Sequence, residues 1–531
     1  MSNTTVDNET LLKNLRDAVW GDQTIFKNQR DLSDAGMGHS HIVDYLDFGE
    51  YLTAIKVIAP TVRSARFLVR EEYRLAFKAF EEDALYSGGA CVMGQPGIGK
   101  SCFIAYAVIE RLRNKQPVAV QIHDESYGLF SEAGVSLHSS RDQEPLRTHQ
   151  GIWAFSDSNA DVDIPAFAFR NTPDVKVFQT TSPKIRRWKE WTKQNMITRY
   201  IMDVWSSEEI TALACCPFGH DVHRMNDLAL KWGAVPRTLL QILGDDQERL
   251  FEREMRGIAL RAIPDCRNTL RSMANLDATL PVDSGPSSIF FIKPRRSRDS
   301  VSRVLHTIYV PTETIAGILG VAVCSAAEGD RQDFFNAMIA SPSTRGAAGF
   351  IFQIWIHSFL SSGNPIQCSW HGKSSKSLPS TLRLASPGQS VCTNDEIRQT
   401  SPPFYWKAPP DFEGIDGALF DEQDNIYAIQ ITVASRHGSP RPGLDKLRRL
   451  LRDEDAKKKK WMVLFIGNRL EQSEIASRKY SDNLQVDVGG KKQKPKTVTV
   501  RVGWCATSPL EAEITAVATL TNYVLPESDD E

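Results

Sequence analysis

In the first half of the chain, short continuous apolar runs alternate with longer stretches whose apolar residues have helical spacing. The apolar runs are predicted to be strands, and they lie at 90–93, 117–122, 151–155 and 175–180. After the first of them, apolar residues fall on one face of a helix from 103 to 112. Strands that alternate with helical segments indicate an α/β fold with a parallel sheet.

Beyond these strands the pattern becomes helical and then more polar. Ser206 and Glu209 have the spacing of a capping box, which predicts the start of a helix, and helical spacing continues to about residue 275. The stretch from 281 to 303 is rich in proline, serine and arginine, and we expect it to be a linker.

A second globular region follows this linker. Residues 363–401 are rich in serine, proline and glycine and are expected to form a long loop. Three strands are predicted after it, at 426–433, 461–466 and 497–504, with a helix at 444–452 between the first two. We therefore expect a second α/β domain in this half of the chain.

The strand at 90–93 runs into a glycine-rich motif at 94–101, which reads GQPGIGKS and fits the P-loop pattern G-x-x-x-x-G-K-[ST]. Lys100 is expected to reach the β- and γ-phosphates of a nucleotide, and the Ser101 hydroxyl is expected to bind Mg²⁺. Because a helix follows, the phosphates would lie at a helix N-terminus, where backbone N–H groups favour anions. ATP and Mg²⁺ are the expected cofactors. The glycines expected to curl around the phosphates are Gly94, Gly97 and Gly99.

An acid at a strand end is needed to hold the Mg²⁺ shell, and two positions compete for this role. Asp157 ends the strand that begins near 151, whereas Asp124 and Glu125 follow the strand at 117–122. Asp124 and Glu125 follow the first strand after the P-loop helix, which is too early in the chain for the acid that holds Mg²⁺. We therefore favour Asp157. In additional-strand ATPases the acid lies on such a strand, which we expect directly beside the P-loop strand.

The residues after Asp157 depart from the usual ATPase pattern, in which a glutamate follows the strand acid. Here Ser158 and Asn159 follow, and these side chains can orient water but cannot accept its proton. We therefore expect ATP binding with slow hydrolysis, or a base supplied by Glu125.

Two further segments carry candidate phosphate-contacting arginines. Past the fourth strand, polar residues from Thr181 onward lie where a first sensor would face the γ-phosphate, and Arg186 or Arg187 could stabilise transition-state charge. A basic surface turn is the equal alternative for either arginine alone. The segment 232–237 resembles the lid turn of AAA+ and STAND ATPases, in which the arginine, here Arg237, touches phosphate.

In the second half, the sequence predicts a hairpin with Asp416 on its first strand and with Gln430 and Thr432 on one face of its second strand. This pattern resembles the PD-(D/E)xK nuclease core, in which acidic ligands hold Mg²⁺ and a lysine positions the attacking water. Asp416 is the expected metal ligand and Gln430 the second site residue. Upstream, Gln353 falls where the first helix of that family often carries a glutamate.

Two of these residues are unusual for a nuclease. Gln430 offers a neutral carbonyl, which is a poorer ligand for Mg²⁺ than a carboxylate, and Thr432 cannot supply the charge of a lysine. Either the site is degenerate, or Lys446 or His437 has taken over the lysine's role.

The overall charge narrows the choice of partners. A formal net charge of −2 gives no general attraction to nucleic acid or to a membrane, so any contact with DNA requires local basic patches. Lysine-rich stretches at 457–460 and 491–496 are candidates for such patches or for nuclear-localisation signals, although solvated loops are the default for each.

The cysteines and apolar segments bear on localisation. The nine cysteines include no C-x-x-C pair, which indicates reduced thiols in an intracellular compartment. The N-terminus lacks the apolar core of a signal peptide, and the longest apolar run, 315–327, is too short to span a membrane. We expect a cytoplasmic or nuclear protein. The spacing of a small cysteine and histidine group matches no standard zinc site; its members are Cys215, Cys216, His220 and His223.

Taken in order, these motifs resemble the Crinkler/RHS-type proteins of fungi and other eukaryotes. The resemblance rests on GQPGIGKS at 94–101, D-S-N at 157–159, S-P-x-x-R-x-W at 182–188, the lid turn at 233–237, an A-G helix at 348–353 and QITV at 430–433. It implies an ATPase module coupled to a domain of the restriction-endonuclease fold. Such proteins are linked with mobile elements, conflict systems and secreted effectors that act in host nuclei.

We therefore expect a P-loop NTPase sheet with a helical lid, followed by a second α/β domain that resembles the restriction-endonuclease fold. The expected function is an ATP-binding switch that controls a DNA-directed, nuclease-like domain; the alternative is a STAND-like scaffold whose degenerate domain recruits protein partners. Self-association into a homo-oligomer is left open. The expected segments are a polar extension at 1–60, the ATPase module at 61–280, a connection at 281–330, the nuclease-like domain at 331–525 and an acidic tail at 526–531.

Overall fold

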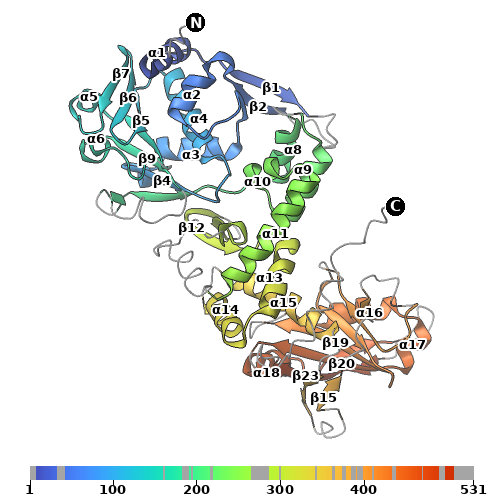
Figure 1. Ribbon diagram of the computed structural model, residues 1–531. Helices are drawn as coiled ribbons and strands as arrows, with labels where there is room; N and C mark the ends of the chain where they lie inside the picture. The colour runs from blue at the N-terminus through green and yellow to red at the C-terminus, as the bar shows by residue number, and fades with distance from the viewer. Residues whose placement is uncertain are drawn as a thin grey trace. The chain divides into compact units, whose positions relative to one another are not determined.

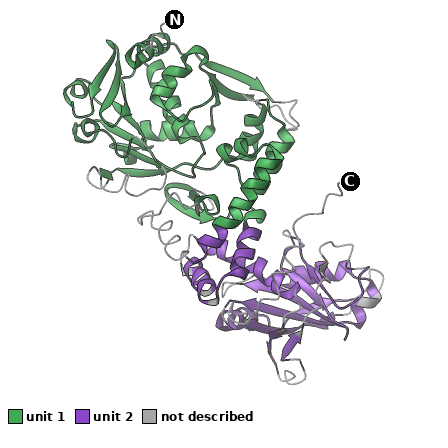
Figure 2. Ribbon diagram, viewed as in Figure 1, with its two compact units in different colours: residues 1–258, 268–315 green, residues 259–267, 316–531 purple. Residues whose placement is uncertain are grey.

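The computed structural model of the chain divides into two compact units, which are described separately below (Figures 1 and 2). Unit 1 comprises residues 1–258 and 268–315, and unit 2 comprises residues 259–267 and 316–531. The residues that the structure describes are 7–32, 42–158, 162–181, 191–192, 195, 197–215, 219–264, 286–297, 300–340, 344–361, 365–372, 378, 380–383, 390–391, 397, 399–409, 412–432, 438–468, 470–488 and 497–506.

The centre of unit 1 is a seven-stranded mixed sheet with the order β10-β4-β9-β8-β5-β6-β7. The strands from β10 to β5 are parallel, and β6 and β7 add an antiparallel hairpin at one edge. The predicted parallel arrangement is thus correct for the first part of the sheet only. The strands are β4 (Gly89–Met93), β5 (Val118–His123), β6 (Ser126–Ser131), β7 (Gly134–Ser139), β8 (Trp153–Asp157), β9 (Lys176–Thr180) and β10 (Thr198–Ile201).

One detail of the expected strand order is wrong. The strand that carries Asp157, β8, does not lie beside β4; it pairs with β5 and β9, and β9 pairs with β4. Strands β4 and β8 are buried along their whole length, as central strands covered on both faces are. Because both are apolar throughout, their pattern contains no signal for which neighbour each one takes.

Helix α4 (Lys100–Arg113) lies between the sheet and the N-terminal helices. It contacts β5, β8 and β9 on one side and α1, α2 and α3 on the other, so most of its residues are buried. The other helices of this part are α1 (Asn8–Val19), α2 (Leu52–Ile58), α3 (Glu71–Glu82), α5 (Glu144–Arg147) and α6 (Phe167–Asn171). A separate antiparallel sheet has the order β1 (Lys27–Asp31), β2 (Ile42–Asp47), β3 (Arg66–Leu68).

A helical segment follows β10. The predicted capping box is confirmed at its start: the Ser206 hydroxyl accepts from the Glu209 N–H at 3.2 Å, and the Glu209 carboxylate accepts from the Ser206 N–H at 3.0 Å. The helices are α8 (Ser207–Leu213), α9 (Val222–Trp232), α10 (Pro236–Gln241) and α11 (Asp245–Ala262). The expected linker region contains an antiparallel hairpin, β11 (Phe291–Arg296) and β12 (Val301–Tyr309), which belongs to unit 1 and contacts β10.

Unit 2 contains a second seven-stranded mixed sheet, with the order β14-β23-β20-β19-β18-β17-β16. Its parallel core is β19 (Asn425–Thr432), β20 (Lys460–Gly467) and β23 (Arg501–Ala506), which agrees with the predicted strands except that the last one is split, β22 (Thr497–Thr499) preceding β23. The sheet continues with β18 (Gly417–Phe420), which is antiparallel to β19, and with β17 (Phe404–Lys407), which is antiparallel to β18. The remaining strand on the β19 side is β16 (Ser390–Val391), and the strand at the other edge is β14 (Ser369–Trp370).

The helices of unit 2 include α15 (Arg345–Ser361), which contacts β17 and β19, and α16 (Arg441–Leu450), which corresponds to the predicted helix at 444–452. The expected long loop at 363–401 is not continuous, because it contains four short strands, of which two pair with each other and two pair with strands of the second seven-stranded sheet. These are β13 (Pro365–Gln367), β14, β15 (Thr381–Arg383) and β16; the other elements are α13 (Glu313–Ser325), α14 (Glu328–Ala340), α17 (Asp453–Lys458), α18 (Leu470–Arg478) and β21 (Gln485–Asp487). Within the described ranges, no helix is both long and apolar enough to cross a membrane.

Candidate functional site

The predicted P-loop forms the connection between β4 and α4. Its three glycines have positive φ angles, 155° at Gly94, 86° at Gly97 and 96° at Gly99, a region that other residues rarely adopt. Space is also restricted, because a side chain at Gly97 would collide with Arg237 and one at Gly99 would collide with the Tyr73 hydroxyl. Both the backbone conformation and the packing therefore require glycine.

Lys100 begins α4, and its side chain turns back into the loop. Its ammonium group donates hydrogen bonds to the carbonyl oxygens of Gly94 and Gln95, each at 3.0 Å. Burial, assisted by the positive charge of Arg237, lowers the pKa of Lys100 to about 7, while the Asp157 carboxylate acts in the opposite direction. An anion bound in the loop would stabilise the charged form of Lys100.

Asp157 lies at the carboxyl end of β8, close to the start of α4. Its Oδ1 accepts a hydrogen bond from the Thr180 hydroxyl at 2.5 Å, and the Ser101 hydroxyl also lies beside the carboxylate. Burial raises the pKa of Asp157, and these two hydroxyls together with Lys100 oppose that effect. The other oxygen, Oδ2, is buried without a hydrogen-bond partner among the described residues.

This set of atoms fits the needs of Mg²⁺. A buried carboxylate oxygen that lacks a protein partner and a neighbouring hydroxyl are hard oxygen donors, which is what Mg²⁺ prefers. The alternative acids, Asp124 and Glu125, lie in the exposed turn between β5 and β6, and strands β8 and β9 separate β5 from the P-loop strand. The geometry favours Asp157.

Arg237, on α10, lies against the loop. It lies in the first turn of α10, which Pro236 opens, and its backbone N–H approaches the Gly97 carbonyl oxygen at 3.5 Å. Its side chain is exposed, and its charge acts on both Lys100 and Asp157. Predicted residues from three separate stretches of sequence, the loop at 94–101, Asp157 and Arg237, therefore lie close together. Arg186 and Arg187 lie outside the residues that the structure describes.

Three buried side chains outside the motif donate hydrogen bonds to carbonyl oxygens of the loop. The sequence patterns did not reveal these contacts. The Arg70 guanidinium and the Trp205 indole N–H donate to the Ile98 carbonyl oxygen at 3.2 and 2.8 Å, and the Tyr73 hydroxyl donates to the Gly99 carbonyl oxygen at 2.8 Å. Arg70 also forms a two-point ion pair with Glu209, with both N–O distances at 3.0 Å. The only sequence signal here was the capping box that contains Glu209.

Gln95 connects the loop to the residues that lead into the β11–β12 hairpin. Its side-chain amide donates to the Ser287 carbonyl oxygen, and its Oε1 accepts from the Ile292 N–H at 3.4 Å. Two ion pairs attach the hairpin nearby: Arg296 with Asp203, and Arg303 with the buried Glu72. Burial raises the pKa of Glu72, and Arg303 is the main charge that opposes this rise.

In unit 2 the predicted residues around Asp416 also converge. The Gln353 amide on α15 donates to Asp416 Oδ1 at 2.9 Å, and the Ile431 N–H donates to Oδ2 at 2.7 Å. Gly417 pairs with Ile429, so Asp416 lies opposite Gln430 across the hairpin. Burial raises the pKa of Asp416 to about 6, against the effect of the Ile431 N–H.

These residues do not form the acidic ligand set that a nuclease metal site requires. Both Asp416 oxygens already accept hydrogen bonds from N–H groups, and the buried Gln430 donates its amide to the Gly438 carbonyl oxygen at 3.2 Å. Across the part of the chain that the structure describes, no group of three or more histidine, cysteine, aspartate or glutamate side chains is placed to hold a metal ion. Cys215, His220 and His223 therefore belong to no such group of described residues, and Cys216 lies outside the described residues.

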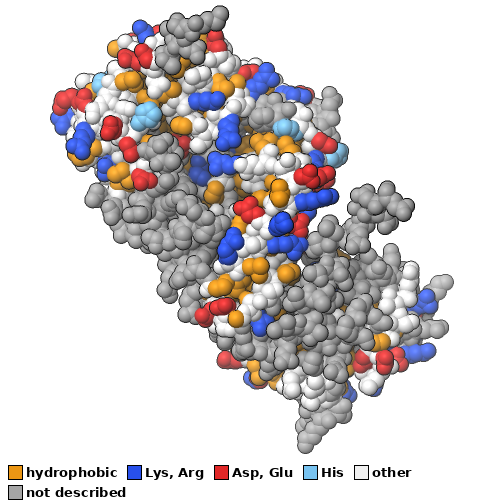
Figure 3. All heavy atoms as spheres, in the orientation of Figure 1, with side chains coloured by type: hydrophobic (Ala, Val, Ile, Leu, Met, Phe, Trp, Pro, Cys, Tyr) orange, Lys and Arg blue, Asp and Glu red, His pale blue; other side chains and the backbone are white. Residues whose placement is uncertain are grey.

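The candidate basic groups of unit 2 are spread over several elements. Arg441, Lys446 and Arg449 on α16 line a shallow cavity of about 440 Å³ together with Asp445. Lys459 pairs with Asp424 at 3.2 Å, so part of the 457–460 cluster is neutralised. His437 and the stretch 491–496 lie outside the described residues. On the face shown in Figure 3, basic and acidic side chains of unit 1 are intermixed, without a broad positive surface.

Comparison with known proteins gives a distant similarity. No established family profile matches the chain. Crinkler effector proteins 16 and 15 of Phytophthora infestans are each 24% identical to it over 231 residues, which is 42% of this chain and 34% and 35% of the two relatives. The chain thus spans about a third of the length of the curated relatives it matches. The Crinkler resemblance inferred from the motifs is therefore supported at the level of a distant relationship.

Proposed function

We propose that unit 1 is a P-loop ATPase module of the additional-strand type, which binds ATP with Mg²⁺ and acts as a nucleotide-dependent switch. This proposal rests on one observation. Four side chains lie close together at a loop that contains three glycines with positive φ angles, and they are those of Lys100, Ser101, Asp157 and Arg237. Strand β9, which lies between β4 and β8, would then be the additional strand.

The roles of the side chains follow from their charges and positions. Backbone N–H groups of the loop and of the first turn of α4 hold the phosphates, and Lys100 adds a point charge. Ser101 and Asp157 would hold Mg²⁺, which neutralises charge on the phosphate oxygens. Thr180 fixes the Asp157 carboxylate by its hydrogen bond, and Arg237 contacts the phosphates from the lid.

Turnover is expected to be slow. Ser158 follows Asp157 and, like serine in general, cannot take the proton of the attacking water. A missing general base typically lowers a rate by about 10²- to 10⁴-fold. The exposed turn that holds Glu125 lies on the far side of β8 and β9 from the loop, which argues against Glu125 as a substitute. The proposed role is therefore a switch rather than a fast ATPase.

Asp157→Asn is expected to weaken the binding of Mg²⁺–ATP about tenfold without weakening metal-free ATP binding, because the carboxylate attracts the nucleotide only through the metal. Titration of a fluorescent ATP analogue with Mg²⁺ and with EDTA measures both affinities. Asp124→Asn is the matched control and should behave like the wild type. If Asp124→Asn loses the Mg²⁺ effect and Asp157→Asn keeps it, the metal ligand has been assigned to the wrong strand.

For unit 2 we propose a nuclease-like, DNA-directed domain whose action depends on the nucleotide state of unit 1. The hydrogen-bonded state of both Asp416 oxygens favours a form of this domain that does not cleave. The same observation supports the second candidate, a non-enzymatic scaffold whose degenerate domain recruits protein partners, as the effector names of the distant relatives would allow.

We expect no Mg²⁺-dependent nicking of supercoiled plasmid by the wild type or by Asp416→Ala, with or without ATP. Agarose gels resolve nicked from intact plasmid, and a gel shift on the same DNA separates a DNA-directed domain from a scaffold that binds only proteins. Nicking by the wild type that disappears in Asp416→Ala would show that the site is catalytic after all.

A further inference from the structure

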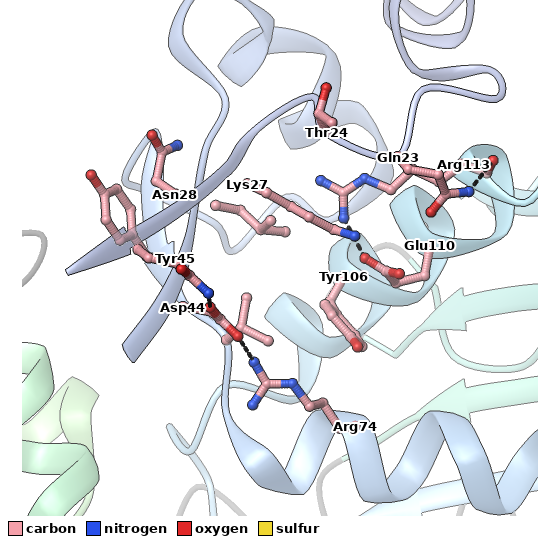
Figure 4. Close-up of a pocket in the computed structure, with 13 residues that line it drawn as sticks. Gln23, Thr24, Lys27, Asn28, Asp44, Tyr45, Arg74, Tyr106, Glu110 and Arg113 are labelled. Carbon is pink, nitrogen blue, oxygen red and sulfur yellow. Dashed lines mark hydrogen bonds and ion pairs between the residues drawn. The ribbon is translucent and has the colours of Figure 1, made fainter. Parts of the chain in front are cut away.

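Unit 1 contains a second pocket, of about 750 Å³, which is separate from the P-loop (Figure 4). Strands β1 and β2 line one side of it, and α3 and α4 line the other. Its α4 residues are Tyr106, Glu110 and Arg113, in the C-terminal part of the helix, whereas the P-loop precedes the helix's first residue. The volume is in the range of pockets that hold small-molecule ligands, about 300–1,000 Å³.

The charged side chains that line the pocket include one cation without an ion-pair partner among the described residues. Arg74 pairs with Asp44, and Arg113 pairs with Glu110, as Figure 4 shows. The ammonium group of Lys27 on β1 makes no hydrogen bond or ion pair with any residue that the structure describes, and the side chain extends from β1 toward α4 (Figure 4). The lining therefore carries a single excess positive charge, which suits one anionic group; a lysine ammonium binds phosphate as a point charge.

The uncharged residues of the lining indicate which other chemical group the ligand carries besides its anionic group. Amide N–H groups of three lining carboxamides already donate to other atoms of unit 1, so their carbonyl oxygens are the groups left to accept hydrogen bonds. Two tyrosine rings also line the pocket and offer surfaces for a planar ring. Carbonyl acceptors together with aromatic surfaces suit a nucleobase that carries an exocyclic amino group. The carboxamides are Gln23, Asn28 and Gln29, and the tyrosines are Tyr45 and Tyr106.

We propose that this pocket binds a nucleoside monophosphate with an amino-bearing base, adenine, guanine or cytosine. Lys27 binds the phosphate, the carboxamide carbonyl oxygens accept from the base, and Tyr106 or Tyr45 lies against its ring. The site is distinct from the P-loop and does not depend on ATP binding there.

The test uses the full-length chain with Lys100→Ala, so that the P-loop does not contribute. Isothermal titration with AMP, GMP, CMP and UMP is expected to show binding of at least one amino-bearing monophosphate and weaker binding of UMP. Adding Lys27→Ala should weaken that binding about tenfold or more, since a charge-assisted hydrogen bond is lost. Lys13→Ala, an exposed lysine on α1 outside the pocket, is the matched control and should have no effect.

Several results would overturn the proposal. No heat of binding for any monophosphate at millimolar concentration excludes the site, and equal affinity with and without Lys27 excludes the assigned phosphate contact. Binding that is present in the wild type and absent in Lys100→Ala places the nucleotide in the P-loop instead. Equal affinity for UMP removes the selectivity for an amino-bearing base. Because Lys27 is exposed, unchanged thermal unfolding of Lys27→Ala verifies that the variant is folded.

Discussion

Replacing Lys100 by alanine is expected to weaken ATP binding about 10- to 100-fold, because charge-assisted contacts with the phosphates are lost. The same substitution should not lower the unfolding temperature. Burial lowers the pKa of Lys100 to about 7, so the folded chain disfavours the charge that the unfolded chain carries at neutral pH. Titration of ATP and a thermal melt of the same sample measure the two effects.

The pH dependence of binding provides an internal check on this prediction. Above pH 7 the free Lys100 loses its proton, so binding of a polyphosphate must take a proton up, and wild-type affinity should fall as the pH rises. The Lys100→Ala variant should lack this component. Lys78→Ala, an exposed lysine on α3, should match the wild type throughout. Unchanged ATP affinity in Lys100→Ala would disprove the nucleotide assignment of the loop.

Removal of Arg70 is expected to produce the largest loss of stability. Arg70→Ala removes the ion-pair partner of Glu209 and the guanidinium hydrogen bonds to the Asp203 and Val204 carbonyl oxygens, while the Ile98 carbonyl oxygen keeps only the Trp205 indole as donor. Breaking a buried ion pair costs about 3 kcal/mol or more, which corresponds to roughly 6–12 °C in the unfolding temperature of unit 1.

The control for Arg70 is an exposed arginine that also pairs with a glutamate. Arg147 bonds Glu144 at 3.0 Å on the surface of α5, and such pairs contribute at most about 1 kcal/mol. Differential scanning calorimetry of both variants measures the difference. Equal changes of the unfolding temperature in Arg70→Ala and Arg147→Ala would mean that the hydrogen bonds and ion pair of Arg70 contribute little to stability.

The local parts of both sites were predictable from the sequence, because short motifs and strand ends carry them. Lys100 and Asp157 lie where a motif and a strand end indicated, since parallel strands bring their carboxyl ends to one edge. Gln353, Asp416 and Gln430 were likewise expected to meet, and the contact between the first two is present.

The surroundings of the sites were not predictable in the same way. Trp205 reaches Ile98 across 107 positions of sequence, and neither residue lies in a periodic pattern that points to the other. The β6–β7 hairpin was missed because its strands follow a predicted parallel strand after a turn of only Asp124 and Glu125, which we had weighed as metal ligands. Composition also placed 291–309 in a linker, although these residues pair as a hairpin.

The attachment of that hairpin has a practical consequence for dividing the protein. Gln95 in the P-loop bonds Ser287 and Ile292, and Phe291 fills the space beside Gly233 at the lid turn. A fragment that stopped at residue 280 would lack both hydrogen-bond partners of the Gln95 side chain and the Phe291 ring that packs beside Gly233. The smallest fragment that retains these contacts of the loop therefore extends through Tyr309, which is beyond the last of the motifs in this half of the chain.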